Sequence, residues 1–84
     1  MCRNITTLRG LEPSATDEEI KSAARQYVRK VSGVQSTSKN TEEAFERAVA
    51  RVARATNDLL DELPPRSQPP ATLPPLRRLR STPL

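Results

Sequence analysis

The chain contains no histidine and no tryptophan, and its 84 residues include one cysteine, one tyrosine and one phenylalanine. One cysteine cannot form a disulfide within the chain, and a zinc site needs several histidine or cysteine ligands. Without histidine, and with its carboxylates expected on helix surfaces, the chain lacks a general base for neutral pH. We therefore expect a non-enzymatic protein with no metal site and no cofactor.

Long apolar runs are also missing. The opening stretch, MCRNITTLRGLEP, has no apolar run of the length found in a signal peptide. No other stretch has the roughly 20 consecutive apolar residues that a membrane-spanning helix needs. We expect a cytoplasmic protein with no membrane partner.

Proline and charge divide the chain into two parts. Residues 1–63 hold one of the eight prolines, and their ten basic and ten acidic side chains cancel. Residues 64–84 hold the other seven prolines and four arginines without any acid, which accounts for the net charge of +4. We predict a small helical domain over residues 1–63 and a disordered, Pro-rich basic tail over residues 64–84.

The stretch PSATDEEIKSAARQYVRKVSG predicts a helix over residues 17–32. Thr16, followed three residues later by Glu19, forms a capping box, and Gly33 suits the left-handed residue that ends a helix. Steps of three and four place the apolar residues on one face of this helix. These residues are Ile20, Ala23, Ala24, Tyr27, Val28 and Val31.

A second helix is predicted over residues 41–63, where apolar positions repeat with the same spacing. Pro64 and Pro65 end this helix, because proline cannot continue a helix and restricts the residue before it. Two amphipathic helices joined by a short polar loop usually pack antiparallel. The sequence therefore predicts an all-α fold, an antiparallel two-helix hairpin.

A short N-terminal helical element is expected in front of the hairpin. Ile5, Leu8 and Leu11 are spaced by three residues, as on one side of a helical turn. We expect this element to lie across the open side of the hairpin and to cover part of its apolar surface.

Five stretches carry a specific resemblance. They are MCRNI (1–5), EPSAT (12–16), QYVRKVSG (26–33), EEAFERAV (42–49) and TNDLLDEL (56–63). Together they resemble the small bacterial proteins of the family known as domain of unknown function 2277. The likeness extends over residues 1–63 and implies no known activity. The Pro-rich tail departs from the charged, Ala-rich tails of that family, so nothing is carried over beyond Leu63.

A looser resemblance is to the J-domain. RGLEPSATDEEIKSAARQYVRK is similar to the first half of a J-domain, and EEAFERAVARVARATNDLLD to its third helix. In J-domains a basic helix and a His-Pro-Asp loop engage a DnaK-type chaperone and stimulate its ATP hydrolysis. Here Ser32, Gly33 and Val34 stand in place of that tripeptide. The resemblance implies a module that docks, competes or scaffolds without stimulating hydrolysis.

Two interpretations of the basic residues on the first helix stay open. The candidate contact residues are Lys21, Arg25, Arg29 and Lys30. They can bind an acidic protein surface, on a DnaK-type chaperone or on a second copy of the chain. They can also form a solvated face softened by pairs such as Asp17 with Lys21. Nucleic acid is disfavoured, because residues 1–63 carry no net charge and few aromatic rings for stacking.

A competing hypothesis concerns the N-terminus. Removal of Met1 would leave the Cys2 thiol beside an α-amine, followed by Arg3 and Asn4. Such a pair can bind a soft metal or attack an electrophile, and Arg3 would favour the thiolate. The alternative is an ordinary cytosolic thiol. One thiol per chain cannot fill a coordination shell, so a metal role would require a dimer or a partner.

Overall fold

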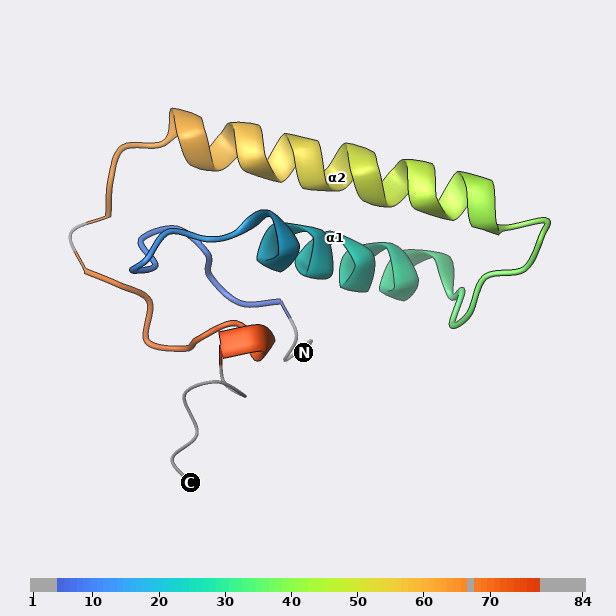
Figure 1. Cartoon of the computed structure of the whole chain (residues 1–84), viewed down its shortest axis with the longest axis horizontal. Coiled ribbons are helices and arrows are strands. Elements are labelled where there is room, and N and C mark those ends of the chain that lie inside the picture. Colours follow the sequence, from blue (N-terminus) through green and yellow to red (C-terminus); the bar gives the residue numbers. More distant parts are fainter. Residues whose placement is uncertain (1–4, 67, 78–84) are drawn as a thin grey trace, which may run out of the picture.

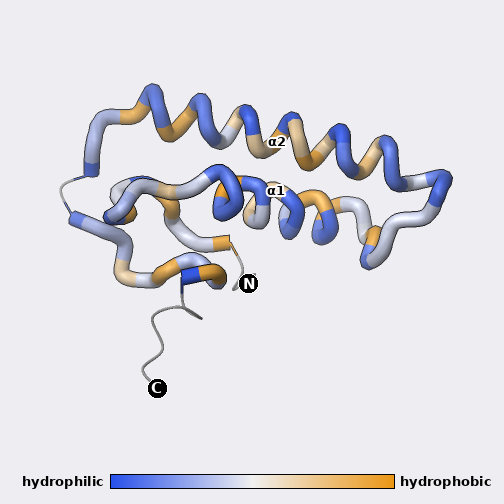
Figure 2. Tube along the Cα trace, in the orientation of Figure 1, coloured by the Kyte–Doolittle hydropathy of each residue, from blue (hydrophilic) through white to orange (hydrophobic). Residues whose placement is uncertain are grey.

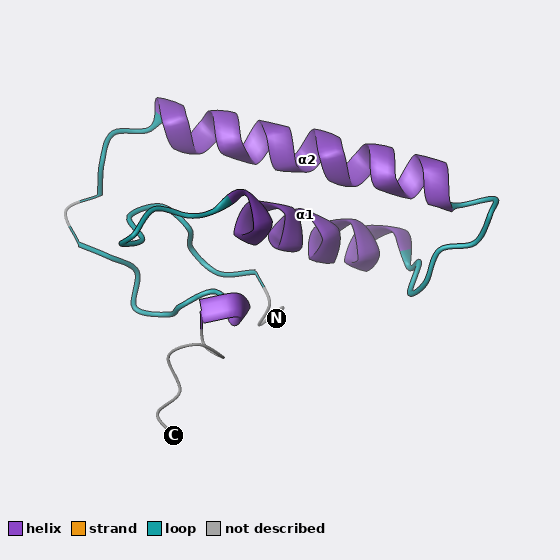
Figure 3. Cartoon of the chain, viewed as in Figure 1, coloured by secondary structure: helices purple, strands orange, loops and turns teal. Residues whose placement is uncertain are grey.

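The computed structural model describes residues 5–66 and 68–77 and contains two α-helices that lie antiparallel, side by side (Figure 1). Helix α1 spans Asp17–Ser32 and helix α2 spans Glu42–Glu62. Apart from one helical turn at residues 75–77, the rest of the described chain is loops and turns, with no strand (Figure 3). The all-α hairpin predicted from the sequence is confirmed. Neither described helix is long and apolar enough to cross a membrane.

Helix α1 begins and ends at the predicted signals. The Thr16 hydroxyl accepts the Glu19 N–H at 3.1 Å, and the Glu19 carboxylate accepts the Thr16 N–H at 2.8 Å. This reciprocal pair is the capping box, and it satisfies N–H groups that have no partner inside the helix. At the other end, Gly33 adopts a φ of 73° and its N–H donates to the Arg29 carbonyl at 2.9 Å.

Helix α2 begins one residue later and ends one residue earlier than predicted. Thr41 does not cap it with its side chain, because the Thr41 hydroxyl accepts the Ser38 N–H at 2.8 Å instead. Beyond Leu63 the chain continues as Pro64-Pro65, which cannot donate helical hydrogen bonds. The loop between the helices is polar and exposed, as predicted.

The core lies between the helices and consists of buried Ala24, Val28, Phe45 and Val49. Figure 2 shows the apolar positions of both helices along this seam. Two residues assigned to the apolar face of α1 are not covered: Tyr27 is 49% exposed and Val31 is 65% exposed. The apolar arc of α1 is wider than the surface that one partner helix can bury.

The predicted N-terminal helical element is wrong. Residues 5–16 contain no helix in the structure, and the chain turns once at Arg9 and Gly10. The three-residue spacing corresponds only to a single turn, in which the Leu11 N–H donates to the Leu8 carbonyl at 3.4 Å. Gly10 adopts a φ of 88°, which no right-handed helix can include. Leu11 is still buried, so the turn contributes to the core.

The C-terminal tail differs most from the prediction. Of residues 68–77, the last four lie against the first turns of α1, on the side of the helix that faces away from α2 (Figure 1). We call residues 68–77 the strap. Pro70 and Pro74 are buried, and Leu73 and Leu76 are half-buried. Proline has little conformational freedom to lose, so a Pro-rich segment can be ordered at a low entropic cost. Residues 78–84 of the predicted disordered tail lie outside the described residues.

One ion pair joins the strap to the start of α1. Arg77 donates from Nε to Glu19 Oε2 at 2.7 Å and from Nη2 to Glu19 Oε1 at 3.0 Å. Its Nη2 also donates to the Ser14 carbonyl at 3.0 Å. Burial alone raises the pKa of Glu19, but the hydrogen bonds from Arg77 and Thr16 and the charge of Arg77 outweigh burial and lower it. Glu19 is therefore a buried, paired carboxylate.

A second contact lies where the strap begins. A Cβ added to Gly10 would lie 2.9 Å from the Arg66 Cβ and 3.2 Å from the Gln68 carbonyl oxygen. The N-terminal turn thus passes close to Arg66 and Gln68. Only glycine supplies both the positive φ and the space at this crossing.

Comparison of the two glycines tests this crossing. We expect Gly33→Ala to lower the free energy of unfolding by about 1 kcal/mol, because Gly33 has a positive φ but open space around its Cα. We expect Gly10→Ala to cost about 2–4 kcal/mol, because strain at Arg66 adds to the same backbone cost. Urea unfolding followed by circular dichroism measures both. Equal losses would mean that Arg66 and Gln68 do not pack on the turn.

The lowered pKa of Glu19 predicts a pH dependence of stability. A carboxylate with a depressed pKa in the folded state stabilises the fold above its unfolded pKa, and this contribution is lost as the pH falls through the folded pKa. At pH 7 we expect Glu19→Gln to cost about 2 kcal/mol. The difference from the wild type should shrink between about pH 5 and pH 3. A difference that stays constant over this range would contradict the ion pair.

Candidate functional site

The basic edge of α1 was the predicted contact surface, and three of its residues lie on successive turns. Lys21, Arg25 and Arg29 are four residues apart, so they line one edge of the helix. The middle one is not free to bind a partner. Arg25 donates from both terminal nitrogens to the Glu46 carboxylate of α2, at 2.8 Å each. Arg25 is thus a link between the two helices.

The Arg25 side chain also covers the core. Its guanidinium carbon lies 5.7 Å from the centre of the Phe45 ring, within the range of a cation–π contact. The hydrogen bonds to Glu46 raise the pKa of Arg25. Hydrogen bonds from Arg25 lower the pKa of Glu46, and the positive charges of Lys21 and Arg29 lower it further. One carboxylate is therefore surrounded by all three cations of the edge.

Lys30 lies apart from this edge. It follows Arg29 by one residue and is turned about 100° further round the helix. There it lines a shallow polar depression together with Arg29, Gln26, Gly33 and Gln35. Lys30 therefore adjoins the basic edge only at Arg29.

A surface patch that the sequence did not predict combines Lys30 with two exposed apolar side chains, Tyr27 and Val31. Val28 is buried in the seam, and Tyr27 and Arg29 are turned about 100° to either side of it. Tyr27, Lys30 and Val31 are spaced by three and four residues, so they are neighbours on the helix surface. We call these three residues the Tyr27 patch. Sequence periodicity could not reveal it, because periodicity counts apolar residues without showing which of them a partner helix covers.

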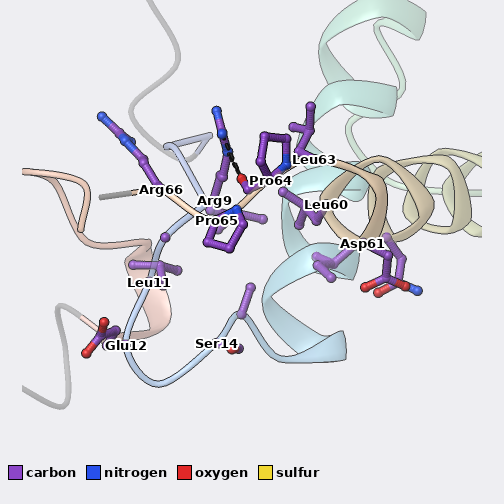
Figure 4. A pocket seen from close by; sticks show the side chains of 15 residues that line it. Arg9, Leu11, Glu12, Ser14, Leu60, Asp61, Leu63, Pro64, Pro65 and Arg66 are labelled. Carbon is purple, nitrogen blue, oxygen red and sulfur yellow. Dashed lines mark hydrogen bonds between the residues drawn. The ribbon is translucent and has the colours of Figure 1, made fainter. Parts of the chain in front are cut away.

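The structure also has a groove of about 400 Å³ between the N-terminal turn and the end of α2 (Figure 4). Arg9 reaches across it, donating from Nε and Nη2 to the Pro64 carbonyl at 3.1 and 2.7 Å. Figure 4 shows Glu12 and Asp61 on opposite sides of the groove, so they do not form a carboxylate pair. Two segments far apart in sequence line it, residues 8–20 and 57–66, so local sequence patterns could not reveal it.

The N-terminal candidates Cys2, Arg3 and Asn4 lie outside the described residues. The thiol hypothesis therefore stays a prediction. Within residues 5–66 and 68–77, no three histidine, cysteine, aspartate or glutamate side chains come together in a way that could hold a metal ion.

Comparison with known proteins shows the family to which the chain belongs. Residues 1–82 match the family described as "Uncharacterized conserved protein (DUF2277)". The chain belongs to this family. The match confirms the resemblance drawn from MCRNI and the later motifs, and it corrects its extent. The DUF2277 match continues past Leu63 to residue 82, so it includes the whole strap. No curated protein and no solved structure matches the chain.

The strap lies inside the part of the chain that matches the DUF2277 family, and it packs against other matched residues. Its ion pair with Glu19 links it to EPSAT and the start of α1, which also lie in the matched region. In front of α1 the described residues contain a turn and no helix.

The two roles of the basic edge can be separated by stability measurements. We expect Arg25→Ala to lower the melting temperature more than Lys21→Ala, because Arg25 holds Glu46 and covers Phe45. Lys21 is exposed and makes no hydrogen bond to any described residue. Thermal unfolding by circular dichroism measures both variants. Equal melting temperatures would show that the link between the helices does not stabilise the hairpin.

Proposed function

We propose that this protein is a non-enzymatic, cytoplasmic protein–protein interaction module that binds its partner through the C-terminal half of α1. The observation that carries the proposal is the exposure of Tyr27 and Val31, at 49% and 65%, beside the exposed Lys30. Tyrosine is one of the residues that most often dominate binding energy at protein interfaces. The partner would cover these two side chains.

The charge of the surrounding surface favours an acidic partner. Lys30 is exposed beside Tyr27, and Lys21 and Arg29, on the other side of the buried seam, add positive charge to the same helix. Arg25 and Glu46 neutralise each other, so they contribute little to attraction. Complementary charge mainly sets the rate and specificity of association, whereas the apolar patch supplies most of the affinity.

A DnaK-type chaperone is one acidic partner that the J-domain resemblance suggests, and a second copy of the chain is another. Ser32, Gly33 and Val34 replace the His-Pro-Asp tripeptide at the end of α1. We therefore propose docking or competition at such a chaperone without stimulation of its ATP hydrolysis.

Affinity capture with tagged, intact protein from its own cells tests the contact surface. We expect Lys21→Glu with Arg29→Glu to reduce recovery of the partner at least about tenfold. We expect Tyr27→Ala with Val31→Ala to weaken binding by about 2 kcal/mol, or about 30-fold. Quantitative mass spectrometry measures recovery.

The matched control is Arg51→Glu with Arg54→Glu, which makes the same change of charge on exposed positions of α2. This control should retain the partner, and all variants should keep their helical circular dichroism. The same set of captured proteins from the wild type and every variant would contradict the proposed surface.

A further inference from the structure

The strap fills a closed site between the N-terminal segment and α1. Thr6 and Leu8 line one side of this site, and Glu19, Ser22 and Ala23 of α1 line the other. Residues 74–76 of the strap, Pro-Pro-Leu, occupy it and leave no room for a water molecule. We call the five lining residues the strap site.

The strap site combines two kinds of recognition. Its apolar part receives the two prolines and Leu76, which need no hydrogen bonds from it. At its end the Glu19 carboxylate takes the Arg77 guanidinium as a two-pronged pair, at 2.7 and 3.0 Å. A planar fork of this kind fits arginine and not lysine. The site therefore distinguishes a Leu-Pro-Pro-Leu-Arg segment by both shape and charge.

One polar atom of the site is left unsatisfied by the strap. The Thr6 hydroxyl is buried and has no hydrogen-bond partner among residues 5–66 and 68–77. Pro74 and Pro75, which line the same site, have no N–H to offer it. A buried hydroxyl without a partner weakens the contact that buries it. The strap thus fills its site without satisfying the Thr6 hydroxyl.

We propose that the strap site is a recognition site for an arginine-ended, proline-containing segment of a partner protein, and that the strap occupies it as a built-in competitor. The partner segment has an arginine at the place of Arg77 and an N–H donor at the place of Pro74 or Pro75. It displaces the strap by satisfying the Thr6 hydroxyl. This site lies along the first turns of α1, whereas the Tyr27 patch lies at the C-terminal end of the helix, so the site does not depend on the patch.

The strap can leave without opening the hairpin. The core cluster is built from α1, α2 and their flanking residues, and it includes no residue of the strap. Displacement therefore costs the contacts of the strap, including the pair of Arg77 with the buried Glu19, and leaves the core between the helices in place.

The test uses the full chain carrying Arg77→Ala and a fluorescent peptide, ATLPPLR, which copies residues 71–77. Fluorescence anisotropy should show saturable binding to this variant. Binding to the wild type should be at least about tenfold weaker, because the tethered strap competes at a high effective concentration. The peptide ATLPPLK should bind the variant at least about tenfold more weakly than ATLPPLR.

Two further peptides test the role of Thr6. ATLAPLR and ATLPALR each restore one backbone N–H, and one of them should bind the variant about five- to 50-fold more tightly than ATLPPLR. This gain should disappear when Thr6→Val is added to the variant, whereas binding of ATLPPLR should remain. No gain from either peptide would overturn the assignment of Thr6.

Several outcomes would overturn the proposal as a whole. One is no binding of ATLPPLR to an Arg77→Ala variant that keeps its helical signal. Another is equal binding when Glu19→Gln is added. A wild-type dimer that Arg77→Ala dissociates would show that a second copy, and not a different protein, occupies the site. If Arg77→Ala lowers the helical signal, Arg77→Lys replaces it, because lysine keeps the charge and loses the two-pronged contact with Glu19. The peptides should then bind this variant in the same order of affinity.

Discussion

A single buried carboxylate joins the parts of this molecule. The Glu19 side chain accepts the Thr16 N–H that starts α1 and the guanidinium of Arg77 from the strap. A buried charge is costly unless it is paired and hydrogen-bonded, so the cap of the helix and the end of the strap are each complete only when the other is present. The strap is therefore part of the folded structure.

This arrangement makes α1 the central element. Helix α2 covers one side of it, and the N-terminal segment and strap cover another, but only along its first turns. The C-terminal half of α1 has no such second cover, which leaves Tyr27 and Val31 exposed. A hairpin of this size has too little chain to bury every apolar side chain that its helices carry. The exposed patch is a consequence of the architecture.

The two proposed interaction surfaces follow from the same helix in different ways. The Tyr27 patch is open and basic, and nothing in the described part of the chain occupies it. The strap site is closed and acidic, and its occupant shows which chemistry it accepts. Arg25, by contrast, was a candidate contact residue and is a link to Glu46. Within one basic edge, the acidic neighbour on α2 decides which cation stabilises the fold and which remain open to a partner.

The sequence by itself determined the features that depend on neighbours within about four residues. These are the capping box of α1, the left-handed Gly33, the end of α2 before Pro64-Pro65, and the antiparallel hairpin that a short polar loop imposes. The tertiary structure alone decided the partner of Arg25, which lies 21 positions away, and the partner of Glu19, which lies 58 positions away. Local spacing has no information about such pairs, because they form only when distant segments are brought together by packing. For the same reason a Pro-rich, basic tail that reads as disordered becomes a strap once a buried carboxylate and an apolar site are there to receive it.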